Sequence, residues 1–110
     1  MEISVVPLGL GKTSVGDYIA AVVKYLETEN LPHELTDMGT LVQGTPDTLL
    51  RVAAALHELP FKQGVQRVMT HISIDDRRDK EVFLGDKQKS VKARLDLLAP
   101  VLLKVGAIDK

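Results

Sequence analysis

The sequence predicts an α+β domain of the ferredoxin-like type, in which two helices cover one face of a four-stranded antiparallel sheet. Two observations predict it. Short β-branched runs and amphipathic helical stripes alternate in the order β-α-β-β-α-β, and one more helical segment follows. The length of 110 residues fits one hydrophobic core. We therefore expect a single βαββαβ sandwich with an additional C-terminal helix, a core over residues 2–98 and an extension over 99–110.

The first strand and helix occupy the first third of the chain. Residues 3–8 are rich in β-branched side chains and stop at Gly9, which is typical of a strand. Ser14 is expected to cap the next helix, because Asp17 follows three residues later as in a capping box. Pro32 is expected to stop this helix. The helix carries one apolar stripe, made of Val15, Tyr18, Ile19, Val22, Val23 and Leu26.

A hairpin and a second helix come next. Residues 33–37 and 40–43 read as short strands, and Gly39 between them is expected to supply the positive φ of a tight turn. Thr45 suits the helix cap and Pro46 the first helical position. The apolar stripe of this helix consists of Leu49, Val52, Ala53 and Leu56, and Pro60 is expected to end it.

Residues 66–75 show the clearest alternation of the sequence between side chains of one face and the other, which predicts the last strand. Val68, Ile72 and Ile74 should face the helices. The opposite, open face of the strand should carry Arg67, Met69, His71 and Ser73. That face stays bare unless another subunit or the third helix covers it. The third helix should start after Asp86 and carry Val91, Leu95, Leu98 and Leu102, and residues from Pro100 onward form the one candidate tail.

Composition excludes several classes of function. Without cysteine, the chain has no disulfide and no thiolate site. Fourteen basic and fifteen acidic residues leave no strong basic footprint, and the four aromatic residues lie outside the predicted strands, so we expect no nucleic-acid partner. The three histidines lack metal-ligand spacing. With no long apolar run and an acid at position 2, we expect a cytoplasmic protein without a membrane partner.

Several segments together resemble the YkoF-like family of small thiamine-binding proteins. They are Val6-Pro7-Leu8-Gly9, Met38-Gly39-Thr40, the stretch 67–72 and Asp76-Arg77-Arg78-Asp79, and the resemblance covers roughly residues 2–98. It implies a ferredoxin-like domain, dimers or tetramers built by sheet-to-sheet packing, and binding of thiamine or its hydroxymethylpyrimidine part. The chain departs from the family pattern at Asp37, where the family often has proline.

The resemblance also directs the choice of site residues. An aminopyrimidine ring offers an amine donor, ring-nitrogen acceptors and flat apolar faces, so its site needs hydroxyl, carboxylate and thioether groups. Arg67 and His71 are expected to bind an anion or to have a structural role, such as an ion pair. We expect no catalytic residue, metal or cofactor. The ligand-binding candidates of suitable type are Ser4, Asp37, Met38, Thr40 and Met69.

Two alternatives stay open. One is a small enzyme that uses His71 as acid or base, which is suggested by the placement of His71 beside Arg67 on the open face. The other is an assembly module whose open face exists only to build the homo-oligomer and which binds no small molecule.

Overall fold

The computed structural model describes residues 1–9 and 16–104, with side chains described through Leu98. Within these residues, four strands and three helices follow the predicted order. The elements are β1 (Glu2–Pro7), α1 (Gly16–Thr28), β2 (His33–Leu35), β3 (Thr40–Val42), α2 (Pro46–Lys62), β4 (Val68–Ser73) and α3 (Asp86–Lys104). The predicted cap Ser14 lies outside the described residues.

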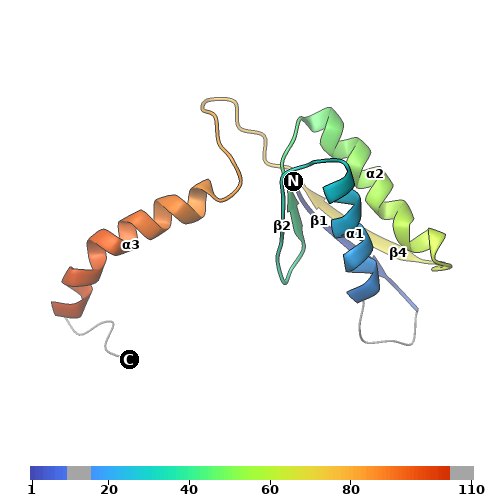
Figure 1. The fold of residues 1–110 in the computed structure, drawn as a ribbon, viewed down its shortest axis with the longest axis horizontal. Helices are drawn as coiled ribbons and strands as arrows, with labels where there is room; N and C mark the ends of the chain where they lie inside the picture. The colour runs from blue at the N-terminus through green and yellow to red at the C-terminus, as the bar shows by residue number, and fades with distance from the viewer. Residues whose placement is uncertain (10–15, 105–110) are drawn as a thin grey trace.

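The strands form one antiparallel sheet in the order β2-β3-β1-β4, and α1 and α2 lie against the same face of it (Figure 1). β1 and β4 pair over their whole length, from Glu2 opposite Ser73 to Pro7 opposite Val68. This is the ferredoxin-like fold that the element order predicted.

The core lies between the sheet and these two helices. Leu26 of α1 and Leu56 of α2 have no exposed surface, and Val42 of β3 is equally buried. Fully burying a side chain of this size contributes about 1.5–3 kcal/mol. The remaining buried members of the cluster come from the same elements and are Ile3, Val22, Leu49, Val52 and Ala53.

Helix α2 begins as predicted but ends later. The Thr45 hydroxyl accepts a hydrogen bond from the Thr48 N–H at 3.3 Å, which satisfies one free donor of the first turn. Pro60, the predicted end, lies inside the helix and is buried. The proline removes one donor only, and the Pro60 carbonyl accepts hydrogen bonds from the N–H groups of Gln63 and Val65 at 3.0 and 3.2 Å. The chain therefore completes its last turn beyond the proline.

The β2–β3 hairpin closes through Thr36 and Gly39. The Thr36 N–H and hydroxyl both donate to the Gly39 carbonyl, at 2.9 and 2.8 Å. The predicted positive φ at Gly39 is wrong, since the glycines with positive φ in the described residues lie elsewhere. Gly39 is needed because a Cβ there would lie 2.9 Å from the Ile3 carbonyl oxygen. The hairpin approaches β1 so closely at this position that only glycine, which has no Cβ, fits.

Helix α3 extends away from the sheet and from the other two helices (Figure 1). The radius of gyration is 18.3 Å, whereas a compact chain of this length has about 13 Å. The helix begins at Asp86, one residue before the predicted start, and continues through Pro100 to Lys104, in line with the apolar spacing that runs from Val91 to Leu102. Residues 100–104, expected as part of a tail, belong to the helix. No helix in the described residues has the length and apolar character that crossing a bilayer requires.

Candidate ligand-binding face

The face of the sheet opposite α1 and α2 carries the candidate site. Ile3 of β1 belongs to the core, so its neighbours Glu2 and Ser4 point to the opposite face. Thr70 of β4 is hydrogen-bonded to His57 of α2, so Met69 and His71 point away from that helix. The alternation agrees with the predicted division of β4 into two faces, but Ile72 and Ile74, which were expected to face the helices, are 46% and 39% exposed, and Ile74 lies beyond the end of the strand.

The strand register brings side chains from different strands into rows on this face. Ser4 pairs with His71, and Val6 pairs with Met69. Side chains paired in this way have Cβ atoms about 4.5–5.5 Å apart. A hydroxyl and an imidazole therefore stand together beside a valine and a thioether. Val6 and Met69 are 37% and 46% exposed, so the single chain leaves part of this apolar surface open to water.

An acidic row, formed by Glu2 and Glu34, crosses one end of the same face. Both residues pair with Leu41, so the two carboxylates flank one leucine. Sequence reasoning missed both glutamates. Alternation along β1 could have placed Glu2 beside Ser4, but Glu34 joins the row only through the β2–β3 register. The acidic row gives the face a negative end.

Arg67 lies toward the other end of the face. Its carbonyl accepts a hydrogen bond from the Leu8 N–H at 2.9 Å, immediately beyond the paired part of β1. Over the parts of the chain that the structure describes, its guanidinium has no ion-pair partner, so the ion pair suggested for it is not seen within one chain. Six residues of extended strand separate Leu8 from Glu2, about 20 Å. The open face is therefore polarised along β1.

The structure brings some predicted site residues together and separates others. Ser4, Met69 and His71 share the open face. Asp37 and Met38 lie at the β2–β3 turn, where Met38 is 82% exposed. Thr40 pairs with Ile3 and is only 5% exposed, so its side chain lies on the helix-covered face and not beside Ser4. The binding roles of all these residues stay predictions.

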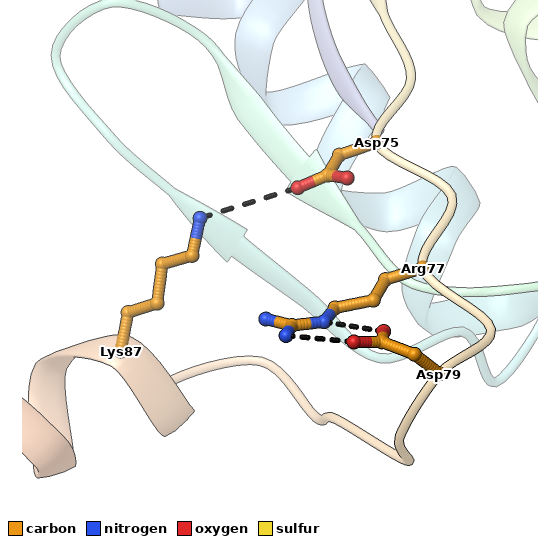
Figure 2. A network of polar contacts seen from close by, with 4 residues as sticks. All are labelled: Asp75, Arg77, Asp79 and Lys87. Atoms are coloured by element: carbon orange, nitrogen blue, oxygen red, sulfur yellow. Dashed lines mark hydrogen bonds and ion pairs between the residues drawn. The ribbon is translucent and has the colours of Figure 1, made fainter.

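The charged connection after β4 is held by ion pairs within itself. Arg77 donates two hydrogen bonds to Asp79, at 2.6 and 2.9 Å, as Figure 2 shows. Arg78 binds Asp76 in the same manner, at 2.8 Å for the shortest contact. Hydrogen bonding to arginine lowers the pKa of both aspartates below the ordinary value. These two arginines are therefore already paired within the loop.

The histidines differ in their surroundings. His33 donates from Nδ1 to the Leu31 carbonyl at 2.8 Å. His57 is half-buried: its Nδ1 is hydrogen-bonded to the Thr70 hydroxyl at 2.8 Å, and its ring lies 5.4 Å from that of Phe61. His71 is exposed on the open face. Within the described ranges, no three histidine or acidic side chains are grouped as a metal site would require.

Comparisons with known proteins agree with this fold. The chain is 41% identical to the UPF0045 protein YqgV of Bacillus subtilis over 98 residues, which are 86% of this chain and 94% of that protein. It is also 41% identical to a UPF0045 protein of Methanothermobacter thermautotrophicus, covering 86% and 96% of the two chains. A solved structure of a hypothetical protein from Methanocaldococcus jannaschii superimposes with a TM-score of 0.72 at 32% identity, over 83% of this chain and 92% of that one.

The sequence profile of the family described as thiamine-binding protein matches residues 1–92, which include the whole sheet, both packed helices and the start of α3. With this match and the similarity to the UPF0045 proteins, the chain belongs to the thiamine-binding protein family.

Proposed function

We propose that the protein binds thiamine or a related hydroxymethylpyrimidine without catalysing a reaction, at or near a subunit interface of a homo-oligomer. The observation that carries the proposal is the pairing of Ser4 with His71 on a sheet face that α1 and α2 leave uncovered. Family membership supplies the class of ligand.

The chemistry of the open face suits the pyrimidine. The Ser4 hydroxyl can both donate and accept, so it can bind a ring nitrogen or the exocyclic amine. The His71 imidazole beside it offers a second donor or acceptor. Met69 and Val6, one row further along, provide an apolar and polarisable surface for the face of the ring. Few polar groups in an apolar setting are typical of small-molecule sites.

The charges on the face favour one orientation of thiamine. The thiazolium ring carries a positive charge, and Glu2 and Glu34 form the acidic end. Arg67 lies toward the opposite end and would repel that cation. We therefore place the pyrimidine over Ser4 and His71 and direct the thiazolium toward the glutamates.

A second copy of the chain would complete the site. Val6 and Met69 are 37% and 46% exposed in one chain, so a small ligand on this face would keep much of its surface in water. Sites that hold drug-sized ligands bury most of the ligand surface and often lie at interfaces. A dimer or tetramer that assembles through the open face would provide that burial.

Isothermal titration with thiamine and with hydroxymethylpyrimidine tests the proposal. Wild-type protein should release or absorb heat with at least one of them. Ser4→Ala should weaken binding about fivefold to tenfold, the usual worth of one hydrogen bond. Ser90→Ala, which removes an exposed hydroxyl on α3, is the matched control and should leave the affinity unchanged. Folded wild-type protein that gives no heat with either ligand would contradict the proposal.

An enzymatic role for His71 is the second candidate, since a hydroxyl stands directly across from the imidazole. A nucleophile and its base need to be within hydrogen-bond reach and oriented by a third group. If a metabolite screen finds any turnover, His71→Ala should abolish it under this reading. Turnover that survives the substitution would exclude His71 as the acid or base.

A further inference from the structure

The connection between β4 and α3 decides where the third helix points. Residues 76–85 have no helix or strand of their own, and α3 then leads away from the sheet and from α1 and α2 (Figure 1). A helix that does not pack on its own sheet takes its direction from the contacts at its first residues. Two polar ties hold this end of the helix, one from Gln43 and one between Lys87 and Asp75.

The side-chain amide of Gln43, which follows β3, binds the backbone of the connection through two hydrogen bonds. Its oxygen accepts a hydrogen bond from the Leu84 N–H at 2.9 Å, and its nitrogen donates one to the Val82 carbonyl at 3.3 Å. A glutamine amide has an acceptor and a donor in one plane, as a peptide group has. Gln43 can therefore bind the connection as a neighbouring strand would.

The backbone that carries this amide is itself fixed. The Gln43 N–H donates to the Pro32 carbonyl at 3.0 Å. The preceding residue, Val42, has no exposed surface and exchanges two hydrogen bonds with Met1, at 2.7 and 2.8 Å. The position of the amide is therefore set by the sheet and its core.

A tight turn transmits this position to the helix. The Asp86 carboxylate accepts a hydrogen bond from the Phe83 N–H at 2.7 Å, and the Asp86 N–H donates to the Phe83 carbonyl at 3.1 Å. Leu84, which Gln43 holds, lies inside this turn and is half-buried. Fixing Leu84 therefore fixes the first turn of α3, and with it the direction of a helix of 19 residues.

The ion pair between Lys87 and Asp75 is much the weaker tie. Its nitrogen and oxygen are 4.0 Å apart, and the two side chains are 91% and 83% exposed (Figure 2). Exposed pairs of this kind contribute little and are screened by salt. Residues 76–81, between β4 and the part that Gln43 holds, are exposed throughout. They form the segment about which the helix could turn.

We propose that Gln43 is a latch that sets the direction of α3 relative to the sheet. With both hydrogen bonds made, the helix keeps one direction. With both broken, it turns about residues 76–81 while the sheet and its two packed helices keep their structure. Loss of one ordinary hydrogen bond changes such an equilibrium about fivefold to tenfold, so loss of both should shift it strongly. This role is independent of what the open sheet face binds.

Distances between two spin labels test the latch, because the chain has no cysteine of its own. The labels are attached to Leu50→Cys on α2 and Leu97→Cys on α3, whose native side chains are both exposed. The labelled full-length chain is diluted into unlabelled protein, so that only distances within one chain are measured. With Gln43 present the distance distribution should be narrow, and in Gln43→Ala it should broaden or move. Circular dichroism checks that the variant is folded.

Matched variants separate the latch from other causes. Gln88→Ala removes an exposed glutamine of α3 and should leave the narrow distribution unchanged, as should Lys87→Ala and high salt. Gln43→Glu still accepts from the Leu84 N–H but cannot donate to the Val82 carbonyl, so its distribution should lie between those of wild type and Gln43→Ala. A narrow, unmoved distribution in Gln43→Ala, or equal broadening in Lys87→Ala, would overturn the proposal.

Amide hydrogen exchange gives a second readout that needs no label. The Leu84 N–H is bonded to the latch, so it should exchange with solvent at least about fivefold faster in Gln43→Ala than in wild type. Its rate in Gln88→Ala should equal that of wild type. The same Leu84 rate in wild type and Gln43→Ala would show that the hydrogen bond does not hold the connection, and would overturn the latch.

Discussion

Ser4 of β1 pairs directly with His71 of β4, and the next pair in the register, Ile3 with Ile72, points to the opposite face of the sheet. Neighbouring residue pairs of the two strands therefore lie on opposite faces of the sheet. Ile3 belongs to the buried core under α1 and α2, while Ser4 and His71 stand on the open face. Folding and binding can therefore be disturbed separately by substitutions one residue apart.

Two histidines on opposite sides of β4 provide a matched pair of substitutions. His57→Ala removes the hydrogen bond to Thr70 and the contact with Phe61, and should lower the free energy of unfolding by about 1–2 kcal/mol. His71→Ala, at an exposed position, should change it by no more than about 0.5 kcal/mol. Urea denaturation measures both. Thiamine affinity should fall in His71→Ala and stay unchanged in His57→Ala. A loss of affinity in His57→Ala alone would contradict the assignment of the two residues to opposite faces.

Leucines on α2 test the location of the core. Leu56 is completely buried, and Leu56→Ala should cost about 2–5 kcal/mol, from lost burial and from the cavity that remains. Leu50 on the same helix is 56% exposed, and Leu50→Ala should cost about 0.5 kcal/mol or less. Equal losses for the two variants in urea denaturation would contradict this packing.

The amino terminus predicts a pH dependence of stability. The Met1 amine donates to the Val42 carbonyl at 2.8 Å, and partial burial lowers its pKa below the ordinary value of 8.0, against the opposing effects of Asp75 and Glu2. The unfolded chain then binds more protons than the folded one just below pH 8. This contribution to stability should therefore increase as the pH rises toward 8 and be lost as the pH falls.

Denaturation at closely spaced pH values between about 7 and 8.5 measures the slope. An N-terminally acetylated chain has no titrating amine and should lose this part of the pH dependence. A slope of the same size in the acetylated protein would assign the effect to another group.

Phosphorylated thiamine should bind more weakly than thiamine. Its phosphate is attached on the thiazolium side and would approach Glu2 and Glu34 in the proposed orientation. Repulsion of about 1–2 kcal/mol at a partly exposed site corresponds to roughly tenfold in affinity. Titration calorimetry of both compounds checks the difference, which should shrink at high salt because exposed charges are screened. Tighter binding of the phosphate would reverse the orientation and implicate Arg67.

The fold could be predicted from the sequence because local signals agreed with the global arrangement. Alternation in β4 separates the side chains of its two faces, and the stripe of α2 identifies the buried face of that helix, both without reference to the rest of the chain. The prediction that Pro60 ends α2 was wrong because proline removes only one hydrogen-bond donor, and the last helical turn tolerates that loss. The prediction of a positive φ at Gly39 was wrong because glycine is required there by close approach to β1, which is distant in sequence.

The candidate site could be predicted only in part, because it depends on register. Strand parity placed Met69 and His71 on the open face. Thr40 was expected to bind the ligand because its hydroxyl is of a suitable type, but its pairing with Ile3 turns it toward the helices. Glu34 reaches the open face through pairing with Leu41, a relationship that no local pattern encodes.

Binding of thiamine on the open sheet face is the central claim, and chemical-shift mapping by NMR tests it most directly. Titration of thiamine into isotope-labelled protein should shift the amide signals of Ser4, Met69 and His71 and of their neighbours in β1 and β4. Signals from the exposed side of α2, such as those of Arg51 and Glu58, should stay in place. Shifts confined to α2, or no saturable shifts in folded protein, would contradict the account.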